Sequence, residues 1–263
     1  MHRFTTRPCR FLIHALAVLG AWLLSAPACA DNHTAPINQY GQFEITFTIS
    51  QLLDQETLDS LADVINADEK ITWNMYVPEG YDPGKPAGLM VYISPTPNGW
   101  MPRKWQAVAD EENLIWIGAN DSGNKIVNAR RMLFAVLGPQ IAGKEYAIDA
   151  DRIYLSGFSG GGKVASMIAI DFANLFKGAI YICGVLHWKR NPPPLFDQVK
   201  ANRYVFLTGT DDFNRNLTKN IYRKYQKAGL QKIHLMDILG MAHKTPGTKD
   251  FRKALNYLDD REQ

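Results

Sequence analysis

The sequence predicts an α/β protein in which helices cover both faces of a mainly parallel central sheet. Segments with strand character alternate with helical segments along most of the chain. Residues 88–94 (GLMVYIS) and 114–120 (LIWIGAN) are nearly continuous apolar runs, as expected of strands buried on both faces. The chain has no internal repeat and no low-complexity linker, so we expect residues 31–263 to form one domain.

The first half of the expected sheet begins with an alternating pattern and then becomes continuously apolar. The segments expected here are strands at 42–50, 70–86, 88–94 and 114–120 and helices at 105–113 and 128–146. The second strand runs into a turn rich in Pro and Gly. Because proline lacks a backbone N–H, Gly138-Pro139 is expected to interrupt or end the second helix.

The second half repeats the alternation of strand and helix. The segments expected here are strands at 152–158, 177–184, 203–209 and 232–239 and helices at 162–176, 217–229 and 249–260. Only eighteen residues separate Gly184 from Arg203, and Pro192–Pro194 cannot lie within a helix. We therefore expect no large cap domain, and a shallow, open cleft.

A G-x-S-x-G pattern at Gly157–Gly161 joins an expected buried strand to an expected helix. This context is the one required by a nucleophile elbow, in which a serine occupies a strained turn. Side chains two positions before and after the serine would collide with the neighbouring strand and helix, and glycine relieves both collisions. Ser159 is therefore the candidate nucleophile.

Few histidines follow Ser159 in the sequence, so the candidates for the catalytic base are few. Only His187, His234 and His243 lie after Ser159. Behind a nucleophile elbow, the catalytic residues are expected to follow one another in the sequence as serine, acid and histidine. His187 precedes the loop in which the acid is expected, and His234 lies within an expected strand. His243 lies in the loop "GMAHKTP" directly after the last strand, so it is the expected base.

The acid is expected at the carboxyl end of a strand, where open α/β sheets assemble their sites. Asp171 falls within a helix, Asp197 in another loop and Asp237 within the last strand. Asp211 and Asp212 both follow the strand "YVFLTGT". We expect Asp212 to be the acid, and Asp211 remains its competitor.

The N-terminal residues resemble a secretory signal peptide. "MHRFTTRPCR" carries three arginines and no acidic residue, an apolar core follows, and Ala28 and Ala30 offer small residues for cleavage. We expect residues 1–30 to be removed and the protein to be secreted or periplasmic, without a stable membrane span. A lipoprotein site at Cys29 is less favoured, because Ala26 replaces the leucine usual three residues earlier.

Removal of residues 1–30 leaves equal numbers of basic and acidic residues, since its three arginines account for the formal charge of +3. The sequence therefore gives no indication of nucleic-acid binding. Cys183 is then the remaining cysteine, and no H-x-x-x-H pair is present. This donor set does not favour a zinc site, and we expect neither a metal nor another cofactor.

The elbow at Gly157–Gly161, "LTGTDDFNR", "GMAHKTP" and the upstream "MYVPEGYDPGKPAGLMVYIS" together resemble the α/β-hydrolase superfamily. Within it, the chain is most similar to secreted esterases of the feruloyl esterase and polyhydroxybutyrate depolymerase-like group. The resemblance extends from about residue 70 to the C-terminus. It implies a serine esterase that acts on small or polymer-attached esters through an acyl-enzyme intermediate.

The resemblance also implies which groups stabilise the oxyanion and bind the substrate. The amides of Gly160 and Thr96 would form the oxyanion hole, although Ser94-Pro95-Thr96 replaces the His-Gly pair of many members. Trp100 and Trp188 lie in loops beside the expected cleft, either as a stacking platform for substrate or packed beneath the loops. The alternatives to an esterase are a peptidase of the same fold and a non-catalytic binding protein.

Overall fold

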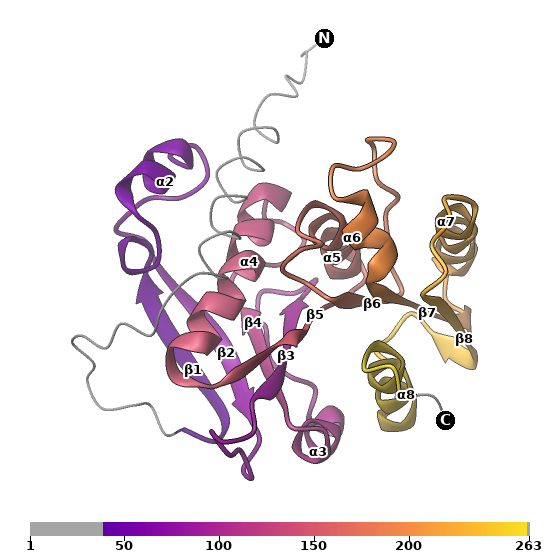
Figure 1. Cartoon of the computed structure of the whole chain (residues 1–263), viewed down its shortest axis with the longest axis horizontal. Helices are drawn as coiled ribbons and strands as arrows, with labels where there is room; N and C mark the ends of the chain where they lie inside the picture. The colour runs from indigo at the N-terminus through magenta and orange to yellow at the C-terminus, as the bar shows by residue number, and fades with distance from the viewer. Residues whose placement is uncertain (1–38, 262–263) are drawn as a thin grey trace.

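One eight-stranded sheet organises the protein (Figure 1). The computed structural model describes residues 39–261, so the expected signal peptide at residues 1–30 lies outside the described residues. The strands are β1 Gly41–Thr48, β2 Lys70–Val77, β3 Ala87–Ile93, β4 Leu114–Ala119, β5 Ile148–Phe158, β6 Gly178–Ile182, β7 Arg203–Asp211 and β8 Ile233–Ala242. Their order is β1-β2-β4-β3-β5-β6-β7-β8. β2 pairs antiparallel with β1 and β4, and the strands from β4 to β8 are parallel, which confirms the predicted fold class.

Helices cover both faces of this sheet (Figure 1). The helical segments are η1 Ile49–Gln51, α2 Gln55–Ser60, α3 Arg103–Glu111, α4 Asn128–Glu145, α5 Gly160–Asp171, α6 Phe196–Ala201, α7 Arg215–Lys227 and α8 Thr248–Leu258. α4, α5 and α7 lie on one face, and α3 and α8 lie on the other. This arrangement explains why the central strands are apolar throughout: both of their faces are buried.

Two apolar cores lie between the sheet and its helices. The larger core lies beneath α4, α5 and α7, and it includes Leu155 of β5 and Phe206 of β7. In the smaller core, Trp105 of α3 stacks on Phe251 of α8 with ring centroids 4.2 Å apart. The Trp105 indole N–H donates to the Pro246 carbonyl at 3.2 Å, so the last helix and the loop before it are fixed to α3 by an aromatic stack and a buried hydrogen bond.

α4 is continuous from Asn128 to Glu145, so the expected interruption at Gly138-Pro139 was wrong. A Cβ at residue 138 would lie 3.2 Å from side-chain atoms of Val91 and Ile117, which shows how closely this helix packs on β3 and β4. The burial of the helix outweighs the single hydrogen bond that Pro139 cannot donate.

The described residues contain no helical cap over the carboxyl ends of the strands. The connection from β6 to β7 contains the six-residue helix α6, which packs against α5. Within residues 39–261 no helix is both long and apolar enough to cross a membrane. The fold therefore leaves the loops after β3, β4, β5, β7 and β8 to form the edge at which the candidate site lies.

Candidate active site

Ser159 lies at the turn that connects β5 to α5. Its backbone has φ 55° and ψ −116°, a conformation that non-glycine residues rarely adopt. Its N–H donates to the carbonyl of Ile182 on the neighbouring strand at 2.8 Å. The strained turn is therefore held by β6, and it presents a partly exposed hydroxyl at the edge of the sheet.

The glycines of G-x-S-x-G allow this turn to close. A Cβ at residue 157 would lie 2.7 Å from the backbone nitrogen of Gly162, which is closer than real Cβ atoms approach. A Cβ at residue 161 would overlap the carbonyl oxygen of Ile93. Both glycines are therefore required by close backbone approach, as the sequence predicts, rather than by a positive φ.

Ser159, His243 and Asp212 form a continuous hydrogen-bonded chain. His243 Nε2 lies 2.9 Å from Ser159 Oγ, and His243 Nδ1 lies 2.7 Å from Asp212 Oδ1. The Asp212 side chain is fully buried, whereas the His243 side chain is 19% exposed. Three residues that are far apart in sequence therefore meet in the geometry of a nucleophile, a base and an orienting acid.

The Asp212 carboxylate is held ionised by its hydrogen bonds. Burial alone would raise its pKa, but donors to both oxygens outweigh this effect and lower the pKa below its ordinary value. The Asn214 N–H donates to Oδ1 at 3.0 Å, and the Thr208 hydroxyl donates to Oδ2 at 2.7 Å. An ionised carboxylate in this position accepts a hydrogen bond from His243 Nδ1–H, and this tautomer leaves Nε2 free to act as the base.

The alternative acid and the alternative histidines lie elsewhere. Asp211 is exposed at the end of β7 and accepts a hydrogen bond from the Thr210 hydroxyl at 3.1 Å. His234, on β8, stacks on Tyr257, and His187 stacks on Trp188. Of the two aspartates that the sequence leaves open, Asp212 is the one that contacts His243.

The two expected oxyanion-hole amides differ in availability. Gly160 is the first residue of α5, so its N–H has no acceptor within the helix. The Thr96 N–H, in contrast, donates to Ser94 Oγ at 3.1 Å. The Thr96 amide is therefore engaged by Ser94 in this structure, and its expected role in the oxyanion hole stays a prediction.

The two expected substrate-binding tryptophans also differ. Trp188 is partly buried and packs against the larger core, with its ring centroid 4.6 Å from that of Tyr225, and its indole nitrogen is buried. It therefore lies beneath the loop rather than forming an open platform, whereas Trp100 is 43% exposed. Of the two interpretations that the sequence left open for Trp188, packing is the one observed.

Phe213 is an aromatic residue of the site that sequence reasoning missed. It is 77% exposed and stacks on the His243 ring with centroids 4.0 Å apart. Phe158 contacts the same ring at 4.9 Å. The sequence could have indicated both residues, because Phe158 directly precedes the nucleophile and Phe213 directly follows the acid.

Cys183 lies beside the triad, and its chemistry does not favour metal binding there. Its sulfur, a His243 nitrogen and an Asp212 oxygen lie within 4.8 Å of one another. Burial and the neighbouring Asp212 carboxylate raise the pKa of the Cys183 thiol well above its ordinary range. Metal ligation requires the thiolate, so these three residues fit a hydrogen-bonded network better than a metal site.

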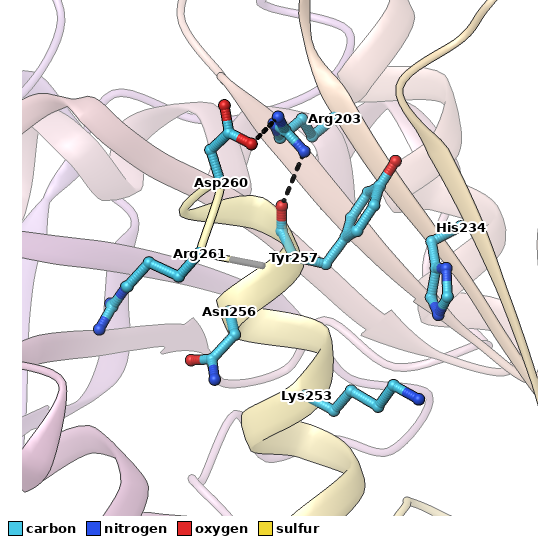
Figure 2. A pocket seen from close by; sticks show the side chains of 7 residues that line it. All are labelled: Arg203, His234, Lys253, Asn256, Tyr257, Asp260 and Arg261. Carbon is cyan, nitrogen blue, oxygen red and sulfur yellow. Dashed lines mark hydrogen bonds and ion pairs between the residues drawn. The ribbon is translucent and has the colours of Figure 1, made fainter. Parts of the chain in front are cut away.

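A separate cavity of about 280 Å³ lies between α8 and the first residues of β7 and β8 (Figure 2). It is lined by Arg203, His234, Lys253, Asn256, Tyr257, Asp260 and Arg261. Arg203 pairs with Asp260 and donates to the Tyr257 carbonyl at 3.3 Å. This cavity is at the amino ends of the strands, opposite the triad, and no triad residue lines it.

Sequence comparison relates part of the chain to a known family. Residues 135–192, which include the elbow, match the profile of the prolyl oligopeptidase family. No curated protein matches the chain in sequence. The matched segment is less than half of the chain, so it is a local similarity around the nucleophile.

Several solved structures share the architecture. An S-formylglutathione hydrolase from Staphylococcus aureus has a TM-score of 0.60 and 11% identity, over 83% of this chain and 98% of that chain. A feruloyl esterase module from Clostridium thermocellum, complexed with sinapinate, has a TM-score of 0.58 and 13% identity, over 88% and 92%. A chain from Bacteroides ovatus, provisionally assigned as a dipeptidyl aminopeptidase IV, has a TM-score of 0.60 and 13% identity, over 85% and 36%.

At these identities the similarity concerns the fold. The strand order, the elbow between β5 and α5, and these neighbours together define the class: the chain has the α/β-hydrolase fold. The fold that the sequence resemblance implied is thereby confirmed.

Proposed function

We propose that this protein is a serine hydrolase that cleaves carboxylic esters through an acyl-enzyme intermediate. The observation that carries the proposal is the hydrogen-bonded chain from Asp212 through His243 to Ser159. Fold alone does not determine activity, but this chain contains the nucleophile, base and acid in hydrogen-bonding positions.

The proposed reaction proceeds in two balanced steps. His243 Nε2 removes the Ser159 hydroxyl proton while Oγ attacks the ester carbonyl, whose π electrons move onto oxygen. The oxyanion then collapses, the bond to the alcohol breaks, and His243 returns its proton to the leaving oxygen. Water, deprotonated by His243, hydrolyses the acyl-enzyme by the same route. Asp212 stabilises the imidazolium in both steps.

The coverage of the structural neighbours favours ester cleavage over peptide cleavage, because the neighbours that match along nearly their whole length are a hydrolase and an esterase. The hydrolase and the feruloyl esterase module are matched over nearly all of their chains, whereas the aminopeptidase is matched over 36%. The profile match to the prolyl oligopeptidase family makes a peptidase the second candidate. Cleavage after Ala30 and a secreted or periplasmic location remain part of this proposal, since they depend on residues 1–30.

Hydrolysis of a matched substrate panel tests the proposal. Aryl, alkyl, feruloyl and hydroxybutyrate esters and dipeptidyl anilides are assayed with residues 31–263 and with Ser159→Ala. We expect ester turnover that falls by about 10⁴–10⁶ in the variant, and labelling of the wild-type protein by a fluorophosphonate. Turnover of anilides alone would favour the peptidase, and a lack of both labelling and turnover would favour a binding protein.

A further inference from the structure

Asn124 lies in the loop between β4 and α4, which contacts the loop after β3. The Asn124 N–H donates to the Pro95 carbonyl at 3.0 Å. A Cβ at residue 123 would lie 2.9 Å from the carbonyl carbon of Thr96, so the two backbones are in direct contact. The loop that carries Asn124 is therefore placed against the segment from which the oxyanion hole was expected.

A buried arginine holds these two loops together. Arg131 of α4 is 3% exposed, and it donates to the Ser122 carbonyl at 2.8 Å and the Ser94 carbonyl at 2.9 Å. Among the described residues it forms no ion pair with a carboxylate. Its guanidinium is thus used to fix the backbones that precede Thr96 and Asn124, rather than to balance a charge.

The Asn124 side chain lies against the nucleophile elbow. A Cβ at residue 160 would overlap the Asn124 carboxamide, with Oδ1 as the nearest atom and Nδ2 3.0 Å away. The carboxamide therefore contacts the residue whose amide is the first oxyanion donor. Within residues 39–261 no acceptor takes either hydrogen of Nδ2, and the side chain is exposed at the edge that holds Ser159.

An oxyanion hole is most effective with two donors directed at the same oxygen. In the part of the chain that the structure describes, no acceptor takes the Gly160 N–H, but the Thr96 amide donates to Ser94 Oγ and Pro95 has no N–H. We propose that the Asn124 carboxamide Nδ2 donates the second hydrogen bond to the oxyanion formed on Ser159. This inference rests on the proposed ester hydrolysis, and it assigns the hole to one backbone amide and one side chain.

The effect of Asn124 substitutions on kcat and KM tests this role. Asn124→Ala removes the donor, and Asn124→Asp keeps the shape while replacing the donor by an acceptor. We expect kcat to fall about 10²–10³-fold in both variants, with KM changed less than about threefold, because the bond forms in the transition state. The control is Asn128→Ala, which removes an exposed asparagine at the start of α4, four residues after Asn124.

A transition-state analogue separates catalysis from structure. A trifluoromethyl ketone forms a tetrahedral adduct with Ser159 whose oxyanion occupies the hole. If Asn124 is a donor, the inhibition constant rises by the same factor by which kcat/KM falls, and the melting temperature stays near that of the wild type. A merely structural role would lower stability without this proportional change.

The outcomes are distinct. Asn124 variants with kcat within threefold of the wild type would overturn the inference, provided that wild-type turnover depends on Ser159. A hundredfold loss in Thr96→Val with none in Asn124→Ala would also overturn it, because the Thr96 hydroxyl would then be the second donor. If wild type and Ser159→Ala both fail to hydrolyse any ester, the proposed function itself fails, and this inference fails with it.

Discussion

At the scale of single residues, the site depends on small differences in position between neighbours. Asp211 and Asp212 are adjacent, yet one is exposed and the other has a fully buried carboxylate with three donors. The turn in which the Asp212 N–H donates to the Gly209 carbonyl at 3.1 Å directs the second side chain inwards. Backbone direction, and not residue type, distinguishes the two.

This difference predicts unequal effects of the same substitution. Asp212→Asn should lower kcat by about 10⁴-fold, because the amide cannot hold His243 in the tautomer with Nε2 free. Asp211→Asn should leave kcat within about twofold, since surface changes away from the site have small effects. Steady-state hydrolysis of an aryl ester measures both. The assignment of the acid is wrong if Asp211→Asn is the more damaging variant.

At the scale of elements, the end of α8 is fixed to β5 by one nearly buried carboxylate. Arg152 donates to Asp259 through Nε at 3.0 Å and through Nη2 at 2.9 Å, and the Tyr154 hydroxyl donates at 2.7 Å. Burial raises the pKa of Asp259, but the Arg152 and Tyr154 donors outweigh burial and lower it. The helix is thus held by a bidentate ion pair in addition to its apolar face.

A depressed carboxylate pKa links this contact to acid stability. The folded pKa of Asp259 is below the unfolded value of about 3.9, so its stabilisation is fully present above that pH and is lost as the pH falls through the folded pKa. Asp259→Asn should therefore lower the free energy of unfolding by about 3 kcal/mol at pH 7, because it leaves Arg152 without its charge partner.

Urea unfolding of both proteins at several pH values measures this linkage. The difference in unfolding free energy between wild type and Asp259→Asn should shrink steadily from pH 5 to pH 2. Asp260→Asn is the matched control: the Asp260 side chain is 66% exposed, and we expect less than about 1 kcal/mol at any pH. A difference that is independent of pH would contradict the role of the Asp259 charge.

At the scale of the whole molecule, the site is open at the edge of the sheet. The connection from β6 to β7 contains one short helix that packs on α5, and the described residues place no helical cap above Ser159. Phe213, which stacks on His243, is 77% exposed beside the triad. An enzyme without a lid has no closed state that a lipid surface would open.

We therefore expect no activation at a lipid–water interface. The rate with a long-chain ester should follow a simple saturation curve through the concentration at which the ester forms micelles, and esters attached to a soluble polymer should be hydrolysed. Turnover of one substrate measured below and above that concentration tests this expectation, with Ser159→Ala as the blank. A sharp rise at the micellar threshold would contradict it.

Features that depend on neighbouring residues were predictable from the amino-acid sequence alone. Period and composition predicted every strand of the sheet. The central strands are continuous apolar runs such as 88–94, because both of their faces are buried, and the edge strand at 42–50 alternates. The elbow was also readable, since a strand, a G-x-S-x-G turn and a helix follow directly in the chain. The order of serine, acid and histidine then limited the base to His243.

Features that depend on contacts between distant segments became visible only in the folded protein. Propensity predicted a break at Pro139, but packing on β3 and β4 holds α4 continuous. Whether the Thr96 amide is free depends on where the Ser94 hydroxyl lies, and whether Asn124 reaches Gly160 depends on how two loops are held by Arg131. Spacing in the sequence carries no information about such approaches, because they are set by the packing of loops that only the folded sheet brings together.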